Sequence, residues 1–260
     1  MVAITSDKRE FIIAAVQQMY TEVAGHPEKV FHFPTGKEAC LFVGYPEAVL
    51  DGLPPTALES FAGVGYPHAA GAVRPGDVVL DVGSGSGTDT LIASREVGPA
   101  GRVYGLDMTA AMLDKLGANI DRFGAANAEP LAGDAEAIPL PDACVDAVTS
   151  NGVLNLVPDK RRAFGEIHRV LRPGGRVQIA DIVVGQPISD ACRADPALWA
   201  ECVVGACLES DYLRLFAEAG FEGITVLRRF DYFAGSAEEK TRKVAAGFEA
   251  HTVELSLVKP

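Results

Sequence analysis

The sequence lacks the features that mark several classes of protein. It contains no apolar run of about 18 residues, the length that a membrane-spanning helix needs. Residues 1–20 carry charges before a short apolar patch but no small-residue cleavage site, so we interpret them as an amphipathic helix. There is one tryptophan, Trp199, and we find no internal repeat or low-complexity segment. These absences favour a cytoplasmic globular protein.

Basic residues and cysteines are also scarce. Lys and Arg number 23 against 35 Asp and Glu, which gives a net charge of −12. Nucleic-acid binding needs many side chains that neutralise phosphates, so we expect a small-molecule partner and neither nucleic acid nor membrane. The cysteine count is odd and without framework spacing, which favours free thiols in a reducing compartment. The cysteines are Cys40, Cys144, Cys192, Cys202 and Cys207.

From Gly76 onward, short apolar runs alternate with segments of helical spacing. The runs stop at glycine or aspartate, as buried parallel strands do. Strands that alternate with helices of roughly 10–15 residues predict right-handed βαβ units and a doubly wound parallel sheet. We therefore predict an α/β fold with a Rossmann-like, seven-stranded sheet. The expected strands are residues 77–83, 101–107, 129–134, 144–151, 176–184, 223–233 and 251–260.

The chain is expected to have three parts. Residues 1–70 are rich in proline, glycine and aromatic residues, which indicates short helices and turns, and we interpret them as an N-terminal helical cap that serves as a substrate lid. Residues 71–185 form the Rossmann-like core. Residues 186–260 form a C-terminal part that completes the sheet and the substrate pocket. The stretch KRRAFGEIHRVLRPGG predicts a helix that is closed by its Pro-Gly-Gly turn.

A glycine-rich stretch, DVGSGSGTD, follows the first predicted strand. In an open α/β sheet, ligands bind at the carboxyl ends of the strands, near this turn. Glycines let backbone N–H groups approach a ligand, because a Cβ would collide with it. Asp107 ends the second strand, where its carboxylate can accept hydrogen bonds from both hydroxyls of a ribose. A dinucleotide fingerprint from Gly83 would require Gly or Ala where Thr88 stands, which opposes a nicotinamide oxidoreductase.

The pattern D-x-G-x-G-x-G resembles the first motif of the class I S-adenosylmethionine-dependent methyltransferases. Met108 directly follows Asp107 and would suit an adenine face, GDAEAIPLPD resembles the third motif of that family, and RVLRPGG resembles its usual turn. The resemblance implies S-adenosylmethionine as the cofactor, with Asp134 bonded to the adenine amino group. The cofactor-binding residues that we expect are Tyr20, Asp81, Gly83, Ser84, Gly85, Gly87, Asp107, Met108, Gly133, Asp134, Ala135 and Asn151.

A second resemblance is more specific. SNGVLNLVPDK, with IADIVV and LWAECVVGAC downstream, resembles the arsenite methyltransferase family over roughly residues 55–225. That family binds trivalent arsenic through cysteines, because As(III) is thiophilic and is best held by thiolates. Three family positions can be placed in this chain. Gly152 and Val64 stand at two of them, and only Cys202 is retained.

The remaining thiols leave two interpretations open. A Cys40–Cys202 or Cys202–Cys207 pair could hold a monomethylated arsenic species with two thiolates. The interpretation that we favour makes Cys202 a small buried apolar residue, as a lone cysteine usually is. With Val64 and Gly152 the pocket would be apolar and roomy, which is consistent with a small organic nucleophile. No resident metal is expected.

Catalytic residues are harder to assign from the sequence. His68, Glu201 and Asp181 are candidate bases, with a loop cap, a surface charge and a strand-end acceptor as their ordinary alternatives. We expect Asn151 to contact the methionine part of the cofactor or the substrate, and Asn155 to stabilise a turn. Tyr20 is expected to close over the cofactor. Trp199 is expected to be a core anchor rather than a substrate platform.

These motifs predict an arsenite-methyltransferase-like enzyme that transfers a methyl group to a small molecule. The first alternative is methylation of a trivalent methylated arsenical through a reduced thiol set. The second is a protein that binds S-adenosylmethionine without catalysis. A nucleic-acid methyltransferase is disfavoured, because SNGVLNLVP contains no Asn/Asp-Pro-Pro-aromatic run. The motifs do not determine the oligomeric state.

Overall fold

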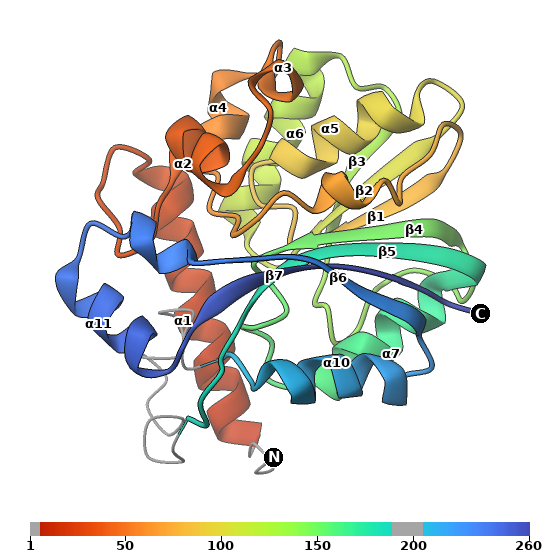
Figure 1. Ribbon diagram of the computed structural model, residues 1–260. Coiled ribbons are helices and arrows are strands. Elements are labelled where there is room, and N and C mark those ends of the chain that lie inside the picture. Colours follow the sequence, from red (N-terminus) through yellow and green to blue (C-terminus); the bar gives the residue numbers. More distant parts are fainter. Residues whose placement is uncertain (1–5, 189–204) are drawn as a thin grey trace.

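The computed structural model describes residues 6–188 and 205–260, with side chains described from residue 8 onward. A single seven-stranded sheet forms its centre (Figure 1), in the order β3-β2-β1-β4-β5-β7-β6. The α/β class and the seven strands predicted from the sequence are confirmed. The strands are β1 (Val78–Val82), β2 (Arg102–Asp107), β3 (Ala128–Ala132), β4 (Val145–Asn151), β5 (Leu171–Val183), β6 (Glu222–Phe230) and β7 (His251–Val258).

The sheet is mixed rather than wholly parallel. Strands β1 to β5 pair in parallel, whereas β7 lies between β5 and β6 and is antiparallel to both. Phe230, the last residue of β6, pairs with Thr252 near the start of β7, so the chain turns back at one end of the sheet. The prediction of a parallel sheet is therefore wrong for this last strand, since a strand that returns from the same end must run antiparallel.

Helices cover both faces of the sheet (Figure 1). α5 (Thr88–Val97) and α6 (Ala110–Phe123) lie on one face, and α7 (Lys160–Val170) and α10 (Glu209–Glu218) on the other. The side chain of Asp159 caps α7 by accepting a hydrogen bond from the N–H of Arg162. α7 ends at Val170, before the predicted Pro-Gly-Gly turn, because proline cannot continue the helical hydrogen bonding. The Arg-Pro-Gly-Gly residues instead lie at the start of β5, where its pairing with β4 shifts register.

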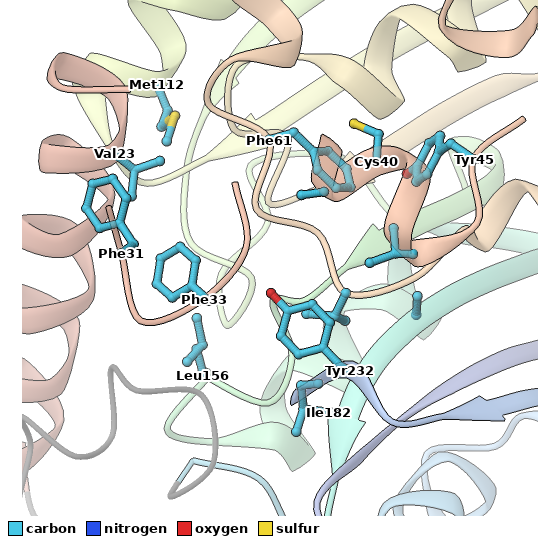
Figure 2. Packing of buried hydrophobic residues seen from close by; sticks show 14 of the residues in the cluster. Val23, Phe31, Phe33, Cys40, Tyr45, Phe61, Met112, Leu156, Ile182 and Tyr232 are labelled. Carbon is cyan, nitrogen blue, oxygen red and sulfur yellow. The ribbon is translucent and has the colours of Figure 1, made fainter. Parts of the chain in front are cut away.

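The N-terminal region forms short helices, as predicted from its prolines and glycines. Its elements are α1 (Ser6–Gly25), α2 (Gly36–Val43), α3 (Glu47–Leu50), α4 (Pro55–Leu58) and η1 (Pro67–Ala70). Val23, Phe33 and Phe61 from this region share one apolar interior with Ile182 of β5 and Tyr232, the first residue of η2 (Tyr232–Gly235) (Figure 2). The helix α11 (Glu239–Gly247) follows η2. The region thus packs on the sheet through a shared core, while its domain boundaries stay a prediction.

Within residues 6–188 and 205–260, no helix has the length and apolar character needed to cross a membrane.

Candidate active site

A cavity opens at the carboxyl ends of β1, β2 and β4. The space at this cavity, with its open mouth included, amounts to about 1030 Å³. This is where ligands bind in open α/β sheets. Most of the residues predicted to bind the cofactor line it. They are Tyr20, Gly83, Ser84, Gly85, Asp107, Met108, Gly133, Asp134, Ala135 and Asn151.

The glycine-rich loop forms one wall of the cavity. Gly83 has φ +75°, in the left-handed region, and a Cβ there would lie 2.1 Å from Cγ2 of Val153. Ser84 lines the cavity, and its buried hydroxyl has no hydrogen-bond partner among the residues that the structure describes. A buried hydroxyl without a partner costs free energy, so it suits a ligand that supplies the missing bond. The loop therefore fits the polar edge of a bound cofactor.

Asp107 is held rigidly at the end of β2. Its Oδ2 accepts a hydrogen bond of 2.9 Å from the N–H of Gly85, and its Oδ1 accepts one of 2.8 Å from the N–H of Thr109. Burial raises the pKa of Asp107, and the backbone hydrogen bonds from Thr109 and Gly85 act in the opposite direction. A carboxylate keeps about four acceptor positions, so both oxygens can also accept from a ribose diol.

Ion pairs and a hydrogen bond connect the predicted adenine side of the cavity to α1. Oδ1 of Asp134 accepts from the N–H of Glu136 at 2.9 Å, and its Oδ2 pairs with Nη2 of Arg9 at 2.8 Å. Arg9 also binds Oε2 of the buried Glu136 at 2.8 Å, and Gln17 donates to the carbonyl oxygen of Met108 at 2.9 Å. Sequence reasoning missed Arg9 and Gln17, because nothing but a helical pattern marks them.

Asn151 joins the end of β4 to the segment before η1. Its Oδ1 accepts from the N–H groups of Val64 and Gly65 at 2.7 and 3.2 Å, and its Nδ2 donates to the carbonyl oxygen of Gly65 at 2.9 Å. The same Nδ2 lies 2.9 Å from the Tyr45 hydroxyl and 3.1 Å from Oδ2 of Asp89. Asn151 lines the cavity, whereas Asn155 is fully buried in the following turn.

His68 lies behind the cavity wall rather than in its lining. Its side chain is 0% exposed, with Nδ1 2.8 Å from Oε2 of Glu96 and Nε2 3.4 Å from Oδ1 of Asp89. Burial by itself lowers the pKa of His68, but the interactions with the carboxylates of Asp89 and Glu96 outweigh it and raise the pKa to about 10. Asp89 does line the cavity, and sequence reasoning missed it although it stands in the quoted glycine-rich motif.

Two residues of the predicted cofactor set are not in the lining. Asp81 lies below the loop and accepts a hydrogen bond of 2.6 Å from Oγ1 of Thr90. Burial, with the nearby charge of Asp89, raises the pKa of Asp81 to about 7. Gly87 packs on Leu116, where a Cβ would lie 2.6 Å from Cδ1. The structure thus places both residues as supports of the loop.

The described cysteines do not line the cavity. Cys40 is buried in α2 near Phe61 and Tyr45 (Figure 2), and its burial raises its pKa well above the ordinary range. Cys207 is buried in a different apolar cluster, on the α7 and α10 face. Nor do the described residues contain three His, Cys, Asp or Glu side chains grouped to hold a metal ion. Three predicted residues lie outside the described part: Trp199, Glu201 and Cys202.

Asp181, the third candidate base, is fully buried and does not line the cavity. Its Oδ2 accepts a hydrogen bond of 2.5 Å from the Tyr212 hydroxyl. Burial raises its pKa to about 7, while the Tyr212 hydrogen bond and the charge of Lys160 act in the opposite direction.

The two positions at which the arsenite methyltransferase resemblance places cysteines lie against each other. Gly152 has φ +73°, and a Cβ there would lie 3.1 Å from Cγ1 of Val64. Gly152 lines the cavity and Val64 is buried directly behind it, 2% exposed. The structure therefore brings the positions together, with no thiol at either.

Similarity to known proteins indicates a methyltransferase. A family model described as a methyltransferase domain matches residues 74–220. The arsenite methyltransferase of Halobacterium salinarum is 44% identical over 164 residues, 63% of this chain and 42% of that protein. That of Aquipseudomonas alcaligenes is 38% identical over 159 residues, 58% of this chain and 46% of that protein. The crystal structure of an arsenic (III) S-adenosylmethionine methyltransferase from Chlamydomonas reinhardtii matches with TM-score 0.69 and 32% identity, over 82% of this chain and 72% of that one.

The fold, the cavity and these similarities place the chain among the class I S-adenosylmethionine-dependent methyltransferases. Within that class it belongs to the family of the arsenite methyltransferases. The chain spans less than half the length of the arsenite methyltransferases of Halobacterium salinarum and Aquipseudomonas alcaligenes. The cofactor of the family is S-adenosylmethionine, and the unpartnered Ser84 hydroxyl and the glycine cradle fit it.

Raising the pH from 6.5 to 10 should lower the free energy of unfolding more in the wild type than in His68→Gln. The pKa of His68 rises on folding from its ordinary 6.5 to about 10, so its stabilisation is complete below pH 6.5 and is lost as the pH rises through 10. For this fully buried side chain the difference amounts to at most about 4 kcal/mol. Urea denaturation at the two pH values measures it. Equal losses of unfolding free energy in the two proteins would contradict the raised pKa of His68.

Proposed function

We propose that this chain transfers the methyl group of S-adenosylmethionine to a small organic acceptor, and that arsenite is a poor acceptor for it. The observation that carries the proposal is that Gly152, in the cavity lining, and Val64, directly behind it, are neighbours and carry no thiol. As(III) needs thiolate ligands, and neither residue supplies one. The activity is a proposal for the chain as given, since it covers less than half of the arsenite methyltransferases of Halobacterium salinarum and Aquipseudomonas alcaligenes.

Bound cofactor supplies an electrophilic methyl group on a positively charged sulfur, and the residues of the chain position it and exclude water. Asp107 would orient the ribose and Asp134 the adenine. Apolar residues of α1, among them Ile12, Ile13 and Val16, line the opposite side of the cavity. Because charge is neutralised when the methyl group leaves, a site that excludes water favours the step. α1, held by Arg9 and Gln17, provides that cover.

The acceptor would lie against an apolar wall. Phe61, Leu156 and Val157 line the cavity together with the apolar residues of α1, whereas the aspartates gather at the strand ends. Among the described lining residues there is no His, Lys or Arg to act as a base or to bind an anion. This favours a nucleophile with an apolar body that needs little deprotonation, such as a thiol, an amine or a stabilised carbanion. Asn151 is proposed as its contact at the end of β4, and Glu201 stays a predicted base.

A turnover screen tests the proposal, with release of S-adenosylhomocysteine as the common measurement. Arsenite, methylarsonite and panels of organic thiols, amines and carbon acids are compared. We expect the best organic acceptor to react faster than arsenite. Efficient methylation of arsenite or methylarsonite that Cys202→Ser abolishes would contradict the proposal, and so would cofactor binding without turnover on any acceptor.

A double variant tests whether positions 64 and 152 can form an arsenic site. Val64→Cys/Gly152→Cys should gain arsenite binding, because it restores two thiols at neighbouring positions. The cost of a Cβ at the left-handed backbone of Gly152 is about 1–2 kcal/mol. Val64→Ala/Gly152→Ala is the matched control, with the same backbone cost and no thiol. Equal arsenite affinity in the two variants would show that these positions do not form an arsenic site.

The net charge of −12 and the scarcity of basic residues support a small-molecule acceptor rather than nucleic acid. The number of cysteines is odd and their spacing is not that of a disulfide framework, which supports a cytoplasmic location.

A further inference from the structure

The cavity presents three carboxylates, on Asp89, Asp107 and Asp134, and no basic side chain among its described lining residues. Asp107 and Asp134 suit the ribose and the adenine. Asp134 is also neutralised by Arg9 at 2.8 Å. Asp89 remains without an assigned ligand group, on the side of the cavity where β4 ends. A carboxylate that faces a site without cations attracts a positively charged ligand group.

We propose that Asp89 receives the ammonium group of the amino-acid part of the methyl donor, and that His68 is the positioning residue behind it. The inference rests on the cofactor of the family and not on the identity of the acceptor. It concerns cofactor binding alone, so it can be tested without turnover.

Hydrogen-bond donors from two other segments orient the carboxylate of Asp89. The Tyr45 hydroxyl donates to its Oδ1, and Nδ2 of Asn151 lies 3.1 Å from its Oδ2. Nε2 of His68 also lies 3.4 Å from Oδ1, so three groups approach the Asp89 carboxylate. A carboxylate has about four acceptor positions, so one stays open on Oδ2, and the place of Asp89 in the lining gives a ligand access to it. Asp89 also stands in the first turn of α5, where the helix dipole stabilises negative charge. With the ribose at Asp107, the amino-acid part of the cofactor would extend past Gly83 toward Asn151 and Asp89.

His68 supports this arrangement from outside the cavity. Its imidazole is fully buried between Glu96, at 2.8 Å, and Asp89, at 3.4 Å. One positive charge thus faces two carboxylates, with the buried Asp81 close enough for its charge to interact with both Asp89 and His68. His68 therefore limits the repulsion among these acids without cancelling the negative charge that Asp89 presents to a ligand. Tyr66, whose ring stacks on His68 at 6.0 Å between centroids, completes its surroundings.

Two ligands separate ammonium recognition from general damage to the site. S-adenosylhomocysteine carries the amino-acid part, and methylthioadenosine has the same nucleoside and thioether without it. By isothermal calorimetry, Asp89→Asn should weaken S-adenosylhomocysteine about tenfold to a hundredfold, because a charge-assisted hydrogen bond is lost. Methylthioadenosine affinity should be unchanged. Asp77→Asn is the matched control, since Asp77 is also an ion-paired aspartate, 2.6 Å from Arg176, but does not line the cavity.

His68→Gln should show the same ligand selectivity with a smaller loss, because Asp89 keeps its charge but loses one of the contacts that position its carboxylate. Asp89→Glu, which keeps the charge, should restore part of the affinity for S-adenosylhomocysteine, and His68→Gln tests the ligand selectivity if Asp89→Asn does not fold. Equal losses of affinity for both ligands in Asp89→Asn would show that Asp89 has only a structural role. An unchanged affinity for S-adenosylhomocysteine would overturn the proposal outright. Neither result bears on which acceptor is methylated.

Discussion

Asp107→Ala should lower the affinity for S-adenosylhomocysteine by a factor of at least about 100. The carboxylate would accept two charge-assisted hydrogen bonds from the ribose, each of about 1.5–3 kcal/mol. It also holds the N–H groups of Gly85 and Thr109, so its loss loosens the glycine-rich loop. Isothermal calorimetry measures the effect directly.

Two variants control for this prediction. Asp107→Asn keeps one acceptor oxygen and should lose less affinity than Asp107→Ala. Asp114→Ala removes an exposed aspartate of α6 and should bind like the wild type. An unchanged affinity in Asp107→Ala would show that the ribose assignment is wrong.

Lys160→Met should lower the free energy of unfolding by about 3–5 kcal/mol, the usual cost of removing one partner from a buried charged network. Lys160 is only 4% exposed, and its Nζ donates to the carbonyl oxygens of Asn155, Val157 and Gly205 at 2.8–3.0 Å. It also lowers the pKa of the buried Asp181. Its removal leaves three carbonyl oxygens short of a donor and the Asp181 carboxyl without its cation.

The neighbouring residue gives the matched control for this second prediction. Arg161 is exposed and pairs with Glu218 on the protein surface. Arg161→Met should therefore cost less than about 1 kcal/mol. Urea denaturation of both variants measures the difference. A loss below about 1 kcal/mol in Lys160→Met would show that the turn after β4 does not depend on this lysine.

Local patterns predicted the strands and helices because each is encoded by neighbouring residues. Gly83, Gly85, Asp107 and Asp134 could be predicted to lie at the cavity, because ligands bind at the carboxyl ends of the strands in an open α/β sheet. The mixed sheet could not be predicted in this way. The direction of β7 depends on where the chain returns after β6, and apolar alternation is the same in parallel and antiparallel strands.

In the active site, too, some features could be predicted from local patterns and others could not. Asp89 stood inside the quoted motif, yet its role depends on Tyr45, His68 and Asn151, which come from three other segments. His68 was predicted to be a base in the pocket, and the structure places it behind the wall. Asp81 and Gly87 were predicted as cofactor contacts and lie outside the lining. Burial and side-chain direction decide such roles, and neither is readable from spacing.

The sequence by itself determined the family, the cofactor and the absence of two arsenic-binding cysteines at 64 and 152, because these depend on which residue stands at which position of a motif. Only the tertiary structure decided that Val64 and Gly152 are neighbours, so that a Cβ at position 152 would lie 3.1 Å from Cγ1 of Val64. It also decided that Arg9 reaches Asp134 and that a buried histidine supports Asp89. These contacts join residues far apart in the chain, and only the packing of the N-terminal helices on the sheet brings them within bonding distance.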